Sequence, residues 1–234
     1  MTIVSVAFDT GGPDAVRAFI RPAVPIVVPA PMREIMSWTA ERYDNAATPT
    51  YPCLIDEKHV VAELYDMPNV PMAVWIDENG RIVRPAESAG ATDGFRKMDR
   101  TTFTMPKDVA DNGRAVRARY VAALRDWIER GAGSRYVLTP EEIRERSAGP
   151  TETDALGAAS FRLGQYLHGR GETALAKRWF DDARRLCPDR WTFFRQALHL
   201  EETGKASGPE FQAAVKALGD SPYYPPADLE PSGH

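Results

Sequence analysis

Residues 69–83 read NVPMAVWIDENGRIV, and this stretch decides the fold. Pro71 has no N–H group to donate to a neighbouring strand, so it is tolerated at the first residue of a strand and penalised inside one. We therefore expect a strand over 72–76, a turn at 77–80 in which the glycine adopts positive φ, and a returning strand over 81–84. Pro71 either simply starts the strand or is a cis-proline that lines a binding groove.

Strands and helices alternate in the sequence before this hairpin. The expected elements are a strand at 3–8, helices at 15–20 and 33–43, a strand at 51–55 and a helix at 57–65. The first run is apolar almost throughout, which is typical of a strand covered on both faces by helices. Asp56 is expected to cap the helix that follows it, in which Val60, Val61 and Leu64 form an apolar stripe. Residues 1–90 thus predict an α/β sandwich with a mixed sheet.

The second half of the sequence is expected to be helical. Residues 85–106 lack hydrophobic periodicity, and we expect a linker over 91–106. A helical region follows over 107–220, in which Thr139 and Pro140 have the residue types that start a helix. The last residues, 221–234, contain four prolines and are expected to form a flexible tail.

Residues 158–188 contain a pattern similar to one tetratricopeptide helix pair. The small and aromatic positions of that motif are occupied by Gly164, Ala176, Phe180, Ala183 and Pro188, with Gly171 at the turn. Ser160 and Leu167 depart from the motif, which prefers tryptophan and tyrosine at these positions. Because three or more repeats are normally needed for a free-standing solenoid, we expect these helices to pack on the first domain.

The composition argues against several classes of protein. The chain has 234 residues, a hydrophobic content of 43% and a net charge of −4, which is typical of a globular chain without a general attraction for nucleic acid or an anionic membrane. No apolar run is long enough for a membrane span, and the N-terminus lacks the basic segment of a signal peptide. The two cysteines lie far apart in the sequence, which suits a reducing compartment. We therefore expect a cytoplasmic protein.

The run from Thr50 to Val83 resembles the second half of a thioredoxin-like domain of the redoxin group. This group includes thiol–disulfide oxidoreductases of the ResA and TlpA type and antioxidant proteins of the AhpC/TSA type. The matching features are the strand–helix insert YPCLIDEKHVVAELY, the Val70–Pro71 pair and the hairpin IDENGRIV. Residues 3–20 look like the strand and helix that precede this insert. The resemblance covers about residues 1–90 and is interrupted by an insertion at about 24–46.

The resemblance implies a thiol–disulfide oxidoreductase or antioxidant whose partner is a protein or peptide thiol or disulfide. It implies that Pro71 is cis and that Val70, Pro71 and Met72 form a substrate groove, whose backbone pairs with an extended segment. The departure from the family is severe, because no Cys-x-x-Cys motif occurs in the sequence. The catalytic residues are therefore unknown, and we expect the chain as given to be inactive.

A missing central strand is a second consequence of the resemblance. In the family, the cysteine motif and its strand come before the strand that residues 3–8 resemble. Without that strand, two neighbours would keep unpaired backbone groups, each costing about 1–3 kcal/mol if buried. Hence we expect one of three elements to fill the position of the missing strand. These are a segment upstream of the given start, residues 25–29, or a partner chain.

The remaining candidate residues give no separate chemistry. Cys53 is interpreted as a buried packing residue, with a redox role as the alternative, because a strand supplies no helix dipole to activate a thiol. No metal site or cofactor is expected, since the histidines show no ligand spacing, and His59 is interpreted as a helix-surface residue. Trp75 is expected in the core. The alternative function is a non-catalytic interaction module that uses the Pro71 groove, the tetratricopeptide-like helices or both. Either function allows an oligomer.

Overall fold

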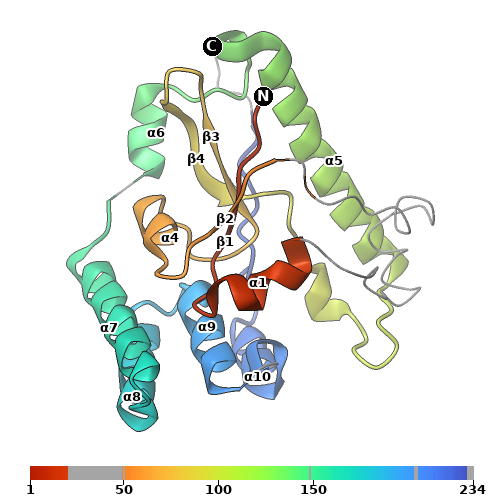
Figure 1. Ribbon diagram of the computed structural model, residues 1–234. Helices are drawn as coiled ribbons and strands as arrows, with labels where there is room; N and C mark the ends of the chain where they lie inside the picture. Colours follow the sequence, from red (N-terminus) through yellow and green to blue (C-terminus); the bar gives the residue numbers. More distant parts are fainter. Residues whose placement is uncertain (21–48, 50, 148, 203–204, 231–234) are drawn as a thin grey trace.

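Two separate pairs of strands form the centre of this mixed α/β protein (Figure 1). The computed structural model describes residues 1–20, 49, 51–147, 149–202 and 205–230. Strand β1 (Ser5–Ala7) pairs in parallel with β2 (Cys53–Ile55), and β3 (Met72–Ile76) pairs with β4 (Ile82–Ser88) in antiparallel orientation. Within the described ranges no ladder joins the two pairs. The mixed sheet expected from the sequence is therefore divided into two.

The hairpin of β3 and β4 follows the sequence prediction closely. The Val70–Pro71 peptide bond is cis, and Gly80 takes a φ of 77° at the turn. The Asp77 carboxylate accepts the backbone N–H groups of Asn79 and Arg81, which fixes the turn. Strand β4 is longer than predicted and reaches Ser88, with a bulge in its pairing.

Helix α5 (Lys107–Arg130) covers the β3–β4 pair. Trp75 is only 2% exposed, stacks on Trp127 at a centroid distance of 5.1 Å and donates its indole N–H to the Tyr120 hydroxyl at 2.9 Å. Arg84 is fully buried, and its guanidinium is bonded to Glu87 and to the Tyr136 carbonyl. The expected core position of Trp75 is confirmed.

Five further helices complete the C-terminal half. They are α6 (Pro140–Arg146), α7 (Glu152–Gly169), α8 (Thr173–Leu186), α9 (Trp191–Glu201) and α10 (Pro209–Ala217). Thr139 caps α6 as predicted, with a reciprocal bond to Glu142. The predicted helix pair is the α7–α8 hairpin, and a Cβ atom at Gly164 would lie 2.6 Å from the Phe180 ring. Only glycine allows the two helices to approach so closely there.

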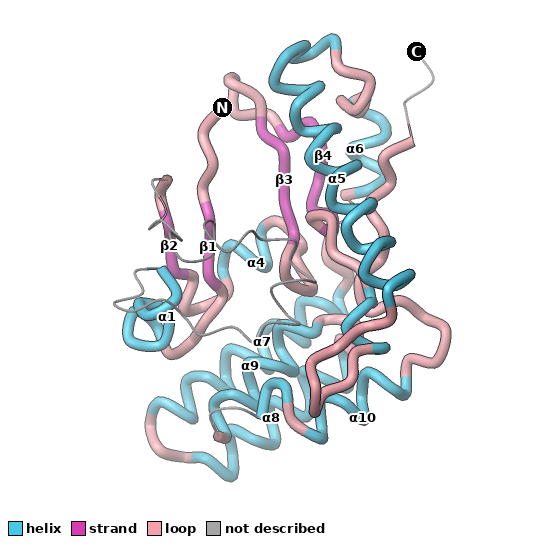
Figure 2. The backbone as a smooth tube through the Cα atoms, turned by 90° about the vertical axis from the view of Figure 1, so that its right-hand side faces the viewer, coloured by secondary structure: helices cyan, strands magenta, loops and turns pink. Residues whose placement is uncertain are grey.

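Helices α7 to α10, which we call the helical layer, are bonded to the strand region, the described part of residues 1–90. The sequence predicts this packing. Gln165 on α7 donates to the Thr10 hydroxyl at 2.6 Å and to the Glu57 carbonyl at 3.2 Å. The Thr192 N–H donates to the Pro68 carbonyl at 3.0 Å, and the Arg190 guanidinium is paired with Asp66. Figure 2 shows this helical layer at the lower ends of the strands.

The segment predicted as a flexible tail is packed in its described part. Tyr223 is 1% exposed and Leu229 is 6% exposed. The backbone N–H groups of Tyr223 and Tyr224 both donate to the Asp93 carboxylate at 2.8 Å. Asp93 starts a short 3₁₀ helix, Asp93–Lys97, within the stretch expected to be a linker. The prolines prevent regular structure here, but the aromatic side chains still bury against the helices.

The β1–β2 pair is held less firmly. Helices α1 (Gly12–Ile20) and α4 (Val60–Leu64) flank it, yet no residue of either strand is buried. Ile3 and Val4 before β1 are 49% and 51% exposed, so the prediction that this apolar run is covered on both faces is wrong for the described residues. The predicted stripe on α4 is also wrong, because Leu64 is 77% exposed.

Two expectations fall outside the described residues. They concern the insertion at about 24–46, which includes the helix at 33–43, and the segment 25–29 as a candidate to complete the sheet. Across the ranges that the structure describes, no helix combines the length and the apolar character needed to cross a bilayer.

Candidate functional site: a polar cavity and two open strand edges

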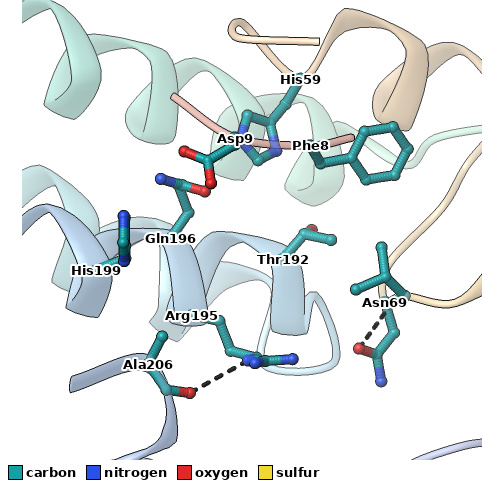
Figure 3. A pocket seen from close by; sticks show the side chains of 10 residues that line it. Phe8, Asp9, His59, Asn69, Thr192, Arg195, Gln196, His199 and Ala206 are labelled. Atoms are coloured by element: carbon teal, nitrogen blue, oxygen red, sulfur yellow. Dashed lines mark hydrogen bonds between the residues drawn. The ribbon is translucent and has the colours of Figure 1, made fainter. Parts of the chain in front are cut away.

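A cavity of about 230 Å³ lies where the strand region meets the helical layer (Figure 3). The strand region contributes Phe8, Asp9, His59, Asn69 and Val70, and the helical region contributes Thr192, Arg195, Gln196, His199 and Ala206. Phe8 and Asp9 follow β1, whereas Asn69 and Val70 precede β3. The end of one strand and the start of another therefore meet at the same cavity.

Helix α9 presents a polar stripe to this cavity. Thr192, Arg195, Gln196 and His199 are spaced at i, i+3, i+4 and i+7, which places them on one face of the helix. Phe193 and Ala197 pack in the core of the α7–α8 hairpin, and Phe194 and Leu198 pack with α10. The sequence analysis missed this stripe. Its signal is a polar row on a helix whose other faces are apolar.

His59 is the second residue whose place the sequence did not predict. Expected on a helix surface, it is only 3% exposed and lies within ring contact of Phe161, at a centroid distance of 5.1 Å. The Asp56 carboxylate accepts the N–H groups of Val60, Val61 and Ala62, so α4 starts after His59. His59 itself takes a left-handed conformation with a φ of 56°, and this turns its side chain inward.

Burial lowers the pKa of His59 to about 4, although the nearby Asp56 and Asp9 carboxylates act in the opposite direction. The imidazole is therefore neutral at physiological pH. A neutral imidazole has one N–H donor and one acceptor nitrogen. In Figure 3 the Asp9 carboxylate lies beside the ring.

Several buried polar atoms at the cavity have no hydrogen-bond partner among the described residues. They are both ring nitrogens of His59, the hydroxyl of Thr192 and the amide nitrogen of Gln196. Thr192 and Gln196 are 7% and 6% exposed. A buried polar atom without a partner costs about 1–3 kcal/mol, so such a cluster calls for an explanation.

Neighbouring amides show that this pattern is local to the cavity wall. The Asn69 amide donates to the Tyr223 carbonyl at 3.0 Å and accepts the Val70 N–H at 2.9 Å. The amide nitrogen of Gln165 on α7 likewise has two acceptors, the Thr10 hydroxyl and the Glu57 carbonyl. The unpartnered amide of Gln196 is thus not a general property of the helical layer.

Of the three predicted groove residues, one lies at the cavity. Val70 and Pro71 are exposed and Met72 is partly exposed, but only Val70 lines the cavity. The two residues before Val70 contact the C-terminal half: the Pro68 carbonyl accepts the N–H of Thr192 on α9, and the Asn69 amide donates to the carbonyl of Tyr223 after α10.

Considering only bonds between described residues, strands β1 and β3 each have one edge without hydrogen bonds. On β1, Ser5 and Ala7 are bonded to the β2 side through the Pro52 carbonyl at 3.0 Å and the Asp56 N–H at 2.8 Å. Since backbone groups alternate along a strand, Val6 presents its N–H and C=O groups to the opposite edge. On β3, the Pro71 carbonyl accepts the Ala89 N–H at 3.2 Å, so Val74 likewise faces away from β4.

Figure 2 shows the strands in the order β2, β1, β3, β4 across the view, so the two open edges face each other. We call these two edges together the strand slot. The backbone groups of Val4 and Val6 lie on one of them, and those of Met72 and Val74 lie on the other. In the part of the chain that the structure describes, no hydrogen bond is made from these edges.

Neither cysteine belongs to the cavity. Cys53 on β2 is partly exposed rather than buried as predicted, and its thiol lies 3.5 Å from the Tyr51 carbonyl. Cys187 is buried at the end of α8, where burial raises the pKa of its thiol. Within the described ranges, no three His, Cys, Asp or Glu side chains are grouped closely enough to hold a metal ion.

Comparisons of the chain with protein-family models, with curated proteins and with solved structures find no match. The redoxin resemblance and the tetratricopeptide-like pattern therefore stay predictions from the sequence.

Proposed function

We propose that this protein is a non-catalytic binding module that takes up an extended segment of a partner polypeptide in the strand slot. The single observation that carries the proposal is the pair of facing strand edges, to which no described residue makes a hydrogen bond. An extended polypeptide is the ligand that can satisfy both edges at once, because its own N–H and C=O groups alternate in the same way.

The orientation of the two edges suits a single inserted strand. Strand β1 ends at the cavity and β3 starts there, so the two strands run in opposite directions. An inserted segment would be parallel to one neighbour and antiparallel to the other, as in mixed sheets. The exposed apolar side chains along these edges, Ile3, Val4, Val70 and Ile76, favour an apolar partner segment.

Thiol–disulfide exchange receives less support from this geometry. The redoxin resemblance implies that reaction, but neither Cys53 nor Cys187 lines the cavity or the slot. Cys53 also lies on a strand and not at a helix N-terminus, the position at which many reactive thiols are activated. We therefore place binding first.

A displayed library of random peptides, selected on the full chain, tests strand uptake. The expected peptides are extended and rich in β-branched residues, and their binding protects the amides of Val6 and Val74 from exchange. Val6→Pro removes the N–H group that faces the slot without removing a bond to β2, and should weaken binding about tenfold or more.

Cys53→Pro is the matched control. Cys53 faces the outer edge of the same two-stranded pair, because Pro52, Leu54 and Asp56 make the bonds to β1. This variant should leave peptide binding unchanged. Equal loss in both variants, or peptides that bind Val6→Pro as well as the original chain, would contradict the proposal.

A further inference from the structure

The polar cavity carries an inference that does not depend on strand uptake. Three of its side chains, His59, Thr192 and Gln196, are more than nine-tenths buried and have polar atoms without a partner in the described chain. They come from two distant parts of the sequence and converge on one space of about 230 Å³. Their donors and acceptors define the chemistry of the group that would fit between them.

The cavity wall offers both donors and acceptors. The amide nitrogen of Gln196 can only donate, whereas the hydroxyl of Thr192 can donate or accept. The neutral ring of His59 supplies one donor and one acceptor. Asp9 lines the same space and can accept, since among the described residues only one of its carboxylate oxygens is engaged, by the N–H of Gly11 at 2.8 Å.

The charges of the wall are balanced without a charged ligand. Arg195 and Asp9 carry opposite charges. The guanidinium of Arg195 donates to the Ala206 carbonyl at 3.2 Å and lies over the ring of Phe211, so it is partly engaged within the protein. A ligand carboxylate would meet the Asp9 carboxylate, and an ammonium group would meet Arg195. A neutral group avoids both repulsions.

We propose that this cavity binds a neutral carboxamide group. Its oxygen accepts from Gln196 and Thr192, and its two N–H groups donate to Asp9 and to the acceptor nitrogen of His59. A carboxamide combines a hydrogen-bond acceptor, its oxygen, with a donor, its nitrogen, in one plane of four heavy atoms, and it carries no charge. It could belong to a small amide or to an asparagine or glutamine side chain of a polypeptide.

Titration of the full chain with propionamide, followed by NMR of the His59 ring and the Thr192 methyl group, tests the proposal. Propionate has the same shape and carries a charge, so it is the matched control. Propionamide should shift both signals in a saturable way, and propionate should bind at least about tenfold more weakly. N-acetylglutamine methylamide, titrated in parallel, distinguishes the sources. Tighter binding than propionamide points to a polypeptide side chain, and weaker binding points to a small amide.

Two variants remove the polar atoms and keep the shape. Thr192→Val and Gln196→Met should each weaken propionamide binding about tenfold. Gln165→Met makes the same change on α7, outside the cavity, and should leave the affinity unchanged. Propionate binding as tightly as propionamide would overturn the proposal. So would the absence of any saturable shift, which would mean that water alone satisfies these atoms.

Failure of this proposal is distinguishable from failure of strand uptake, because the titration uses no peptide partner and Val6→Pro does not alter the cavity wall.

Discussion

The two strand pairs are built from similarly apolar runs, yet they differ in burial. Trp75 and Arg84 in the β3–β4 pair are almost completely buried against α5 and the segments that follow it. No residue of β1 or β2 is buried. An apolar run therefore predicts a strand, while its burial depends on neighbours that the run itself does not specify. The strand slot thus lies between one edge of the buried β3–β4 pair and one edge of the less buried β1–β2 pair.

The largest difference between the pairs should appear in stability. Trp75→Ala removes a fully packed indole together with its hydrogen bond to Tyr120, and should lower the free energy of unfolding by about 3–5 kcal/mol. Val6→Ala on the partly exposed β1 should cost about 1 kcal/mol or less. Denaturant unfolding of both variants measures this contrast. Equal costs would mean that β1 is buried as deeply as β3.

The next effect concerns pH and His59. Its pKa is about 4 in the folded protein and about 6.5 in the unfolded chain, so the unfolded state binds the proton first as the pH falls. Stability from this residue is fully present above pH of about 6.5, falls by about 3 kcal/mol down to pH of about 4, and changes no further below that.

His59→Asn is the control for that prediction, since asparagine tolerates the left-handed conformation at this position. In this variant the loss of stability between these pH values should shrink by about 3 kcal/mol. Denaturant unfolding at several pH values measures it. An unchanged pH profile would show that His59 is not buried in its neutral form.

A smaller effect separates Gln165 on α7 from Gln196 on α9. Gln165→Met removes hydrogen bonds to Thr10 and Glu57 and should cost about 1 kcal/mol. Gln196→Met removes an amide nitrogen without a described partner, and should be neutral or stabilising by up to about 1 kcal/mol. Denaturant unfolding compares the two variants. A cost at Gln196 as large as at Gln165 would assign its amide a structural role.

No effect is expected in a test of thiol chemistry. The chain should not catalyse insulin reduction, and Cys53→Ser should leave this result unchanged, because no second cysteine lies near Cys53 in the sequence and neither cysteine lines the cavity. Turnover that depends on Cys53 would restore the oxidoreductase interpretation.

Local patterns allowed part of this structure to be predicted. The hairpin is specified by Pro71, the glycine turn and the apolar residues of 72–76. Helices are indicated by the Thr139 cap and by the small and aromatic residues of 158–188. The position of His59 could not be predicted in this way. It depends on the Asp56 carboxylate, which accepts the N–H of Val60 so that α4 begins after His59, and on contact with the ring of Phe161, a residue far away in the sequence.

Predicting the cavity would likewise have required knowledge of contacts between residues far apart in the sequence. The redoxin resemblance implied a substrate groove at Val70, Pro71 and Met72, and of these residues only Val70 lines the cavity. The polar stripe of Thr192 and Gln196 becomes a wall only because the helical layer docks on the strand region through contacts far apart in the sequence. The burial of Tyr223 in the expected tail has the same origin, since its N–H is bonded to Asp93.

Amide hydrogen exchange along β3 tests the central claim most directly. In the isolated chain, the amides of Ala73 and Trp75 face β4 and should be protected, whereas the amide of Val74 faces the strand slot and should exchange quickly. The same contrast is expected on β1 between Ala7 and Val6. Protection of Val74 and Val6 equal to that of their neighbours would contradict the account, because it would show that another part of the chain already occupies the slot.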